Sequence, residues 1–234
     1  MAFQLEDIVP WGRSLAEYAG MFDLSHTDLS RRILGCGDGP ASFNAELSAR
    51  GGTVISVDPL YRFDATAIRQ RIDGTFATVM AETRKNVDEF AWRHIPSVDA
   101  LGEMRMGAME AFLADYPNGR ADGRYVAGEV PALGFATNAF DLTLCSHFLF
   151  LYSQHLELAF HIAAIAELCR LSPETRIFPL LQLGATPSPH VAPVIEHFTA
   201  LGYLVERVRV PYEFQRGGNE MLRIRRTAAV GDAS

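Results

Sequence analysis

The sequence is poor in lysine and has no excess of positive charge. Lys85 is the only lysine among 21 basic residues, and 28 acidic residues give a net charge of −7. Non-specific nucleic-acid binding draws most of its free energy from cations that contact phosphates, so an acidic chain is poorly suited to it. We therefore expect no nucleic-acid partner.

Cysteine clusters, a signal sequence and long apolar runs are also lacking. Cys36, Cys145 and Cys169 are far apart in the sequence, and none belongs to a CxxC or Cys/His cluster, which argues against disulfides and a structural metal. The N-terminal segment carries an acidic pair where a signal peptide would be basic, and polar residues interrupt the most apolar stretch, residues 142–166. These features predict a cytoplasmic protein without a metal or a membrane partner.

Apolar material is abundant enough for one large domain. The chain has 234 residues, 48% of them hydrophobic, and can bury a full core without metals or disulfides. Short β-rich runs alternate with helical stretches, which predicts an α/β fold with a parallel sheet covered by helices on both faces. We expect residues 1–234 to form a single domain.

The clearest unit runs from Arg31 to Pro59. A strand over Arg32–Leu34 should enter a glycine-rich turn and then a helix whose first residue is Pro40, because proline lacks the N–H that this position leaves unused. A second, β-branched strand follows over Thr53–Val57, with Asp58 at its C-terminal end. This is a complete β–α–β unit.

Other elements follow from periodicity. Residues 60–123 carry two long apolar stripes at helical spacing, which predict two or three helices that partly cap the sheet. An N-terminal helical segment should place four residues on one face: Trp11, Leu15, Tyr18 and Phe22. The remaining strands are expected at Arg124–Ala127, Asp141–Cys145, Thr175–Leu181, Leu204–Val210 and Met221–Arg226, with helices at Gln154–Arg170 and Val191–Leu201.

The glycine turn, GCGDG at residues 35–39, has the composition of a nucleotide-binding loop. Backbone N–H groups at a strand-to-helix turn attract an anion, and glycine allows a ligand to approach the backbone. Asp58 lies 58 − 39 = 19 residues beyond the last glycine, the spacing at which an acid reaches ribose hydroxyls. The pattern departs from G-x-G-x-x-G, and Asp38 suits a ligand with an ammonium group better than a pyrophosphate.

At these residues the sequence resembles the class I S-adenosylmethionine-dependent methyltransferases. ILGCGDG (residues 33–39) is similar to their first motif, and ISVDP (residues 55–59) is similar to the second. The resemblance implies S-adenosylmethionine as the cofactor. It places three residues of the turn against the cofactor, Gly35, Cys36 and Gly37, and two at the end of the second strand, Asp58 and Pro59.

Two later segments extend the resemblance to about Arg226. GEVPALGF (residues 128–135) is similar to the segment after the family's third strand, which implies that Glu129 and Val130 contact the adenine. FDLTLCSH (residues 140–147) resembles the fourth strand and implies that Ser146 faces the cofactor. The fold implied is a seven-stranded sheet in the order 3-2-1-4-5-7-6, with strand 7 antiparallel and residues 60–123 as a helical insertion between strands 2 and 3.

The acceptor is left open by these motifs. The segment after the fourth strand reads CSHF, not the N/D-P-P-Y/F of family members that methylate DNA bases or glutamine. We therefore expect a small-molecule acceptor. His147 is the candidate general base if the acceptor is a hydroxyl, although a buried structural histidine is an equal interpretation. Tyr152 and Tyr18 are candidate substrate contacts.

Several alternatives remain open at this stage. The chain could be a non-catalytic cofactor-binding subunit, a relative that uses the cofactor for another reaction, or a nicotinamide-dependent dehydrogenase. Cys36 is expected to be a small loop residue and not a nucleophile. The insertion arginines are expected to form a solvated face more than a substrate clamp: Arg69, Arg71, Arg84, Arg93 and Arg105. The loop at residues 212–219 suits a hairpin turn, a substrate contact or a homodimer contact.

Overall fold

The computed structural model describes residues 9–93 and 95–227. The helices are α1 Leu15–Met21, α2 His26–Leu29, α3 Phe43–Ala49, α4 Ala65–Lys85, α5 Val98–Ala121, α6 Leu158–Leu171 and α7 Val191–Ala200. Three 3-10 turns are η1 Pro59–Arg62, η2 Val87–Glu89 and η3 Phe150–Tyr152. The strands are β1 Arg32–Cys36, β2 Thr53–Val57, β3 Tyr125–Val126, β4 Leu142–Ser146, β5 Glu174–Phe178, β6 Leu181–Gln182, β7 Thr186–Pro187, β8 Tyr203–Arg209 and β9 Glu220–Arg226.

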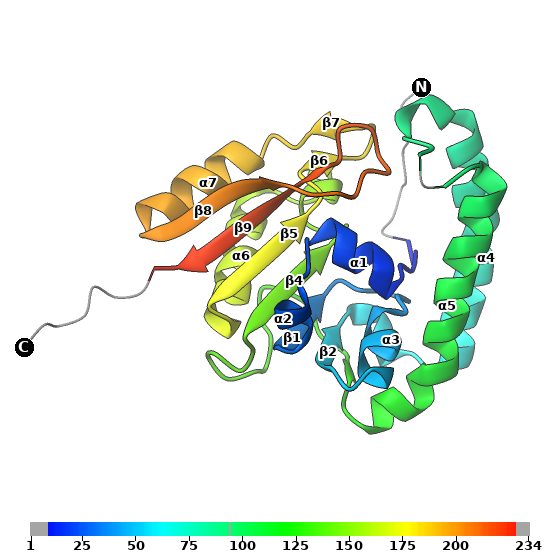
Figure 1. Cartoon of the computed structure of the whole chain (residues 1–234), viewed down its shortest axis with the longest axis horizontal. Helices are drawn as coiled ribbons and strands as arrows, with labels where there is room; N and C mark the ends of the chain where they lie inside the picture. The colour runs from blue at the N-terminus through cyan, green and yellow to red at the C-terminus, as the bar shows by residue number, and fades with distance from the viewer. Residues whose placement is uncertain (1–8, 94, 228–234) are drawn as a thin grey trace, which may run out of the picture.

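Seven strands form one twisted sheet in the order β3-β2-β1-β4-β5-β9-β8 (Figure 1). Strands β1 to β5 pair in parallel, whereas β9 is antiparallel to both β5 and β8. The predicted order, with β8 and β9 as its sixth and seventh strands, is confirmed. The chain therefore has the Rossmann-like α/β sheet of the class I methyltransferases.

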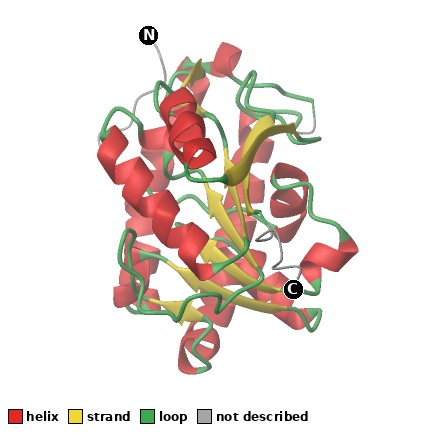
Figure 2. Ribbon diagram, turned by 90° about the vertical axis from the view of Figure 1, so that its left-hand side faces the viewer, coloured by secondary structure: helices red, strands yellow, loops and turns green. Residues whose placement is uncertain are grey.

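Helices cover both faces of this sheet (Figure 2). Side chains of β1 alternate between two cores: Ile33 packs with α1 and α3, and Leu34 packs with α6 and α7. Every residue of β4 is buried, as expected for a central strand of a parallel sheet. No helix in residues 9–93 and 95–227 is both long and apolar enough to cross a bilayer.

Some predicted boundaries are wrong. The helix after the glycine turn begins at Phe43 and not at Pro40, because Gly39 and Pro40 continue the turn. Trp11 precedes α1 instead of lying on its face, and its ring packs 5.5 Å from that of Phe76 in α4. The third strand is limited to Tyr125–Val126.

Two further boundaries differ after β4. The helix expected from Gln154 begins at Leu158, because the carbonyl of Tyr152 accepts the N–H groups of His155 and Leu156 in turns that precede it. The fifth strand ends at Phe178. Pro179 cannot donate to a sheet, and the chain continues into the β6–β7 hairpin, which the sequence did not indicate.

The insertion consists mainly of α4 and α5, which lie side by side at one end of the molecule (Figure 1). At their base, the Tyr116 hydroxyl donates to the carbonyls of Tyr61 at 2.9 Å and Phe63 at 2.8 Å. At the opposite end, the segment between the two helices bonds to the β8–β9 loop: the Ala91 N–H donates to the Phe214 carbonyl at 2.7 Å. The insertion is therefore fixed at both ends.

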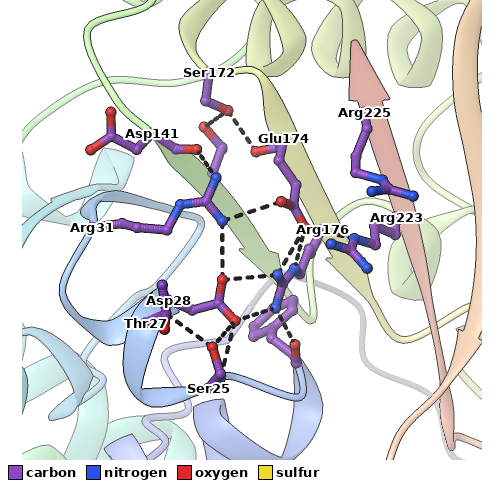
Figure 3. Close-up of polar contacts among 12 residues, drawn as sticks. Ser25, Thr27, Asp28, Arg31, Asp141, Ser172, Glu174, Arg176, Arg223 and Arg225 are labelled. Atoms are coloured by element: carbon purple, nitrogen blue, oxygen red, sulfur yellow. Dashed lines mark hydrogen bonds and ion pairs between the residues drawn. The ribbon is translucent and has the colours of Figure 1, made fainter. Parts of the chain in front are cut away.

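A buried ionic network ties α2 to the N-terminal ends of the central strands (Figure 3). Arg176 contacts Asp28 at 3.1 Å and Glu174 at 2.8 Å. Glu174 also binds Arg31 at 3.2 Å and Arg223 at 2.7 Å. Burial raises the pKa of Asp28, but the hydrogen bonds from Ser25 and the nearby arginines outweigh this effect and lower the pKa to about 2.

We predict that Arg176→Met destabilises the protein by about 3–5 kcal/mol, because two buried carboxylates lose a cation that contacts both. Urea unfolding at neutral pH measures the change. The matched control is Arg84→Met, which removes the exposed pair with Asp99 and should cost less than about 1 kcal/mol. Equal losses for the two variants would contradict the importance of the buried network.

Candidate functional site

A large cavity lies at the C-terminal ends of β1, β2 and β4. Its volume is about 1120 Å³, above the range of roughly 300–1,000 Å³ typical of small-molecule sites. Its lining comes from the strand ends, from α4 and α5, from η3 and from the segment before α1. Ligands of open α/β sheets bind at this edge of the sheet.

The glycine turn forms the floor of the cavity. Gly37 has φ +70°, and its N–H donates to the Val57 carbonyl at 2.9 Å. A Cβ at Gly37 would lie 3.0 Å from Cβ of Phe148. Glycine is therefore required here both by the backbone conformation and by the close approach of the β4 loop.

Asp38 makes hydrogen bonds within the protein, and not the contact with a ligand's ammonium group that its charge suggested. It is buried, and its Oδ1 accepts the Tyr18 hydroxyl at 2.7 Å while its Oδ2 accepts the Ser56 hydroxyl at 2.6 Å. The carboxylate folds over Gly35, where a Cβ would lie 1.9 Å from Oδ2. Burial is the main cause that raises the pKa of Asp38 to about 7. Gly35 is thus needed to admit the side chain of Asp38.

Asp58 joins the end of β2 to the glycine turn and lines the cavity. Its Oδ2 accepts the Gly39 N–H at 2.9 Å, and its Oδ1 accepts the Leu60 N–H at 2.8 Å. Burial raises its pKa, which the two backbone N–H groups oppose. Because an ionised carboxylate has about four acceptor positions, two remain for hydroxyl groups of a ligand.

The cavity wall beside Asp58 comes from Pro59 and from the segment after β3. Glu129 is exposed and Val130 is buried, and both line the cavity. Gly128 passes close to β2, since a Cβ there would lie 3.1 Å from Cγ1 of Val57. The predicted adenine-binding residues are therefore brought to the same cavity as the glycine turn.

Ser146 ends β4, His147 follows it, and both line the cavity. His147 has φ +50°, and its N–H donates to the Phe178 carbonyl at 2.7 Å. Its Nδ1 lies 3.0 Å from Oγ of Ser146. Burial, followed by the charges of Arg13 and Arg105, holds the pKa of His147 well below its usual range. The imidazole is therefore neutral at pH 7.

Tyr18 and Ser146 connect His147 to Asp38. Burial and Asp38 raise the pKa of Tyr18, while a hydrogen bond with Ser146 lowers it. Tyr18 donates its proton to Asp38. If Oγ of Ser146 accepts from Nδ1–H of His147, Nε2 of the imidazole is the acceptor.

The two predicted substrate contacts occupy different positions. Tyr18 is buried, stacks on Phe43 with ring centroids 4.2 Å apart, and reaches the cavity from beneath the turn. Tyr152 is buried in η3 and also lines the cavity. The structure thus brings every predicted site residue except Gly35 to the cavity lining, and Gly35 lies directly below it.

The cysteines do not form a nucleophilic site. Cys36 and Cys145 face each other on β1 and β4, and both are buried free thiols. The hydrogen bond with Cys145, followed by burial, raises the pKa of Cys36 well above its usual value. A protonated thiol is a weak nucleophile, so Cys36 acts as a small residue of the turn.

One of the insertion arginines was misassigned. Arg105 is fully buried and ion-paired with Glu17 at 2.6 Å, so it belongs neither to a solvated face nor to a substrate clamp. Arg71 lines the cavity, where its guanidinium lies 3.8 Å from the centroid of the Phe63 ring. The sequence analysis missed Arg13, which also lines the cavity. A lone arginine before a short helix carries no pattern by which to find it.

Comparisons with known proteins give one strong sequence match. No protein-family model matches the chain. The uncharacterized protein MJ0045 of Methanocaldococcus jannaschii is 33% identical over 225 residues, which cover 95% of this chain and 98% of that protein.

Similarities to solved structures are weaker. The magnesium protoporphyrin IX methyltransferase of Synechocystis PCC 6803 with bound SAM is 14% identical, with a TM-score of 0.44, over 86% of this chain and 73% of that one. A TehB-like SAM-dependent methyltransferase from Corynebacterium glutamicum is 14% identical, with a TM-score of 0.43, over 85% and 81%. A putative RNA methyltransferase from Pyrococcus horikoshii is 12% identical, with a TM-score of 0.42, over 92% and 83%. The fold class of this chain rests on the order and direction of its own strands.

Asp38 predicts a specific pH dependence of stability. Its pKa is raised from 3.8 to about 7 in the folded state, so its contribution to stability is greatest below about pH 4 and is lost as the pH rises towards 7. Asp38→Asn should remove this decline. Urea unfolding from pH 4 to pH 8 measures it, with the exposed Asp73→Asn as control. Parallel pH curves for wild type and Asp38→Asn would show that the carboxyl is not perturbed.

Proposed function

Because the chain belongs to the same family as the uncharacterized protein MJ0045 of Methanocaldococcus jannaschii and has the fold of the class I methyltransferases, we propose that it transfers a methyl group from S-adenosylmethionine to a small-molecule acceptor. The observation that carries this proposal is the common cavity. Segments that are far apart in the sequence, including Gly37, Asp58, Val130 and His147, line one space at the switch point of the sheet.

The residues present fit the cofactor. The unfilled acceptor positions of Asp58 suit ribose hydroxyls, and the wall of Pro59, Glu129 and Val130 suits the adenine. Gly37 leaves the floor of the cavity free of a side chain. A dinucleotide would require free N–H groups for its pyrophosphate. Here the N–H groups of Gly37 and Gly39 already bond to Val57 and Asp58, which disfavours a nicotinamide dinucleotide.

When bound, the cofactor supplies a methyl group already activated by its sulfonium sulfur. The protein then contributes mainly orientation, which supplies roughly 7–11 kcal/mol of barrier reduction in well-aligned reactions. Side chains of α4 and α5, including Val79 and Leu101, line the far wall of the cavity. We propose that the insertion serves as a cap that excludes water from the acceptor.

His147 is the proposed general base for a hydroxyl acceptor. Its imidazole is neutral because burial lowers its pKa, and we propose that Nδ1–H donates to Oγ of Ser146, which lies 3.0 Å away, while Ser146 donates to the Tyr18 hydroxyl that bonds to Asp38. Nε2 is therefore available to accept a proton. Ser146 and Tyr18 act in this proposal as positioning residues, since they fix the tautomer of His147.

A small acceptor is favoured over nucleic acid by two features. The net charge is −7, and the site is a cavity whose wall includes Phe63, Leu151 and Phe160, instead of a basic groove along which phosphates could lie. The alternative of a non-catalytic subunit required an insertion without an enclosed site. Walls formed by α4, α5, His147 and Tyr152 around one cavity support the enzyme.

We predict that S-adenosylhomocysteine stabilises the protein by about 2.7 kcal/mol at about 100 times its dissociation constant. NAD should have no such effect.

Asp58→Ala should weaken S-adenosylhomocysteine binding by about 10-fold or more, because a charge-assisted hydrogen bond is lost. Isothermal calorimetry measures the affinity, and the exposed Asp122→Ala is the control. Binding of NAD without S-adenosylhomocysteine would overturn the assignment of the cofactor.

For His147 we predict the Nδ1–H tautomer at pH 7.5, which nitrogen-detected NMR of the imidazole reports directly. Tyr18→Phe should shift the population towards Nε2–H, because Ser146 then loses its acceptor and donates to His147. Tyr203→Phe, a partly buried tyrosine in β8, is the control. A tautomer that does not respond to Tyr18→Phe would contradict the hydrogen-bond chain.

The same hypothesis predicts the effect on methyl transfer. His147→Asn retains a residue that tolerates positive φ and removes the base, so transfer of labelled methyl to the small-molecule fraction of a cell extract should fall about 100-fold or more. The affinity for S-adenosylhomocysteine should not change. Full transfer by His147→Asn would assign the histidine to the scaffold.

A further inference from the structure

Arg13 is an unneutralised cation in the wall of the cavity. It lies between Trp11 and the start of α1, and it lines the cavity together with His147 and Tyr152. One of its nitrogens, Nη1, donates to the Trp11 carbonyl at 3.2 Å. Its Nε is buried without a hydrogen-bond partner among residues 9–93 and 95–227. A buried donor without a partner costs free energy.

The nearby carboxylate is already used by another residue. Glu17 binds Arg105 at 2.6 Å and also accepts the Tyr212 hydroxyl at 3.1 Å and the Ser14 N–H at 3.0 Å. Arg105 is fully buried, so this pair is a fixed part of the protein core. Glu17 is therefore committed to Arg105, and Arg13 forms no ion pair with a carboxylate in the described part of the chain.

The charge of Arg13 acts at the end of the cavity where the acceptor would lie. After burial, Arg13 is the largest cause that lowers the pKa of His147. Burial raises the pKa of Tyr152, and the charge of Arg13 is one of the effects that oppose this rise. At the other end, burial and the N–H groups of Leu60 and Gly39 account for the pKa of Asp58. Arg13 therefore acts electrostatically on the proposed base, whereas Asp58 responds to burial and to its two backbone N–H partners.

We propose that the methyl acceptor is an apolar small molecule that carries a carboxylate, and that Arg13 binds this carboxylate. The proposal rests on the proposed methyl transfer, because it concerns the second ligand of the same cavity. Apolar side chains supply much of the remaining cavity wall: Trp11, Phe63, Val79, Leu151, Leu156 and Phe160. A guanidinium in such surroundings holds a carboxylate in a fixed, bidentate orientation, which would direct the reacting atom of the acceptor towards His147.

The carboxylate of the cofactor's amino-acid group is the other source of the same chemistry. Two nucleosides, of which only one carries the amino-acid group, distinguish binding of the acceptor's carboxylate from binding of the cofactor's carboxylate. S-adenosylhomocysteine carries the carboxylate and methylthioadenosine does not. If Arg13 serves the acceptor, Arg13→Gln should leave the affinities for both nucleosides within about twofold of the wild-type values.

The test of the acceptor site uses protein saturated with S-adenosylhomocysteine. Naphthoate and naphthamide are the probes, because they share an apolar body and differ in charge. We expect wild type to bind naphthoate at least about 10-fold more tightly than naphthamide. Arg13→Gln should abolish this preference, and Arg13→Lys should restore it in part. Arg50→Gln, at an exposed helix end outside the cavity, should behave as wild type.

Three results would overturn the proposal. Failure of naphthoate to bind, or retention of its advantage in Arg13→Gln, removes Arg13 as the carboxylate ligand. Weaker binding of S-adenosylhomocysteine but not of methylthioadenosine to Arg13→Gln assigns the arginine to the cofactor. Absence of S-adenosylhomocysteine binding to wild type is a separate result, since it refutes the proposed function itself and not the role of Arg13.

Discussion

The buried carboxylate of Asp38 is the contact on which the geometry of the site depends. It joins three segments that are separate in the sequence: α1 through Tyr18, β2 through Ser56 and the end of β1 at Gly35. Because this acid faces the interior, the glycine turn stays open towards the cavity. In the proposed mechanism the same acid ends the chain of side chains that orients His147, so the floor of the cavity and the tautomer of the proposed base would depend on one residue.

Much of the fold follows from local sequence patterns. The β-branched run Thr53–Val57 and the apolar strand before Ser146 have few alternatives to buried parallel strands, and the long apolar stripes of residues 60–123 predict the helices of the insertion. The residues at which turns begin and end were harder to predict. The start of α3 at Phe43 and the end of β5 at Phe178 depend on how turns bond to neighbouring segments, which single-sequence periodicity does not encode.

The residues of the site were likewise predictable from the sequence only in part. Asp58 and the glycine turn were found because their spacing reflects one β–α–β unit. The roles of Asp38 and Arg105 were not found, because both depend on partners about 20 and 88 residues away, Tyr18 and Glu17. Charge alone suggested that Asp38 contacts a ligand and that Arg105 lies in a solvent-exposed face. Burial assigned both to the interior, whereas Arg13 lines the cavity together with Arg71.

The contacts at the tip of the insertion have a mechanical consequence. Besides the Ala91–Phe214 hydrogen bond, the Arg216 N–H donates to the Glu89 carbonyl at 2.8 Å. Main-chain hydrogen bonds therefore join the outer end of the α4–α5 pair to the β8–β9 loop. Any swing of α4 and α5 away from the strand ends must either break these bonds or pull that loop along. Residues 211–219 would thus follow any movement of the insertion, although they lie far beyond the end of α5 in the sequence.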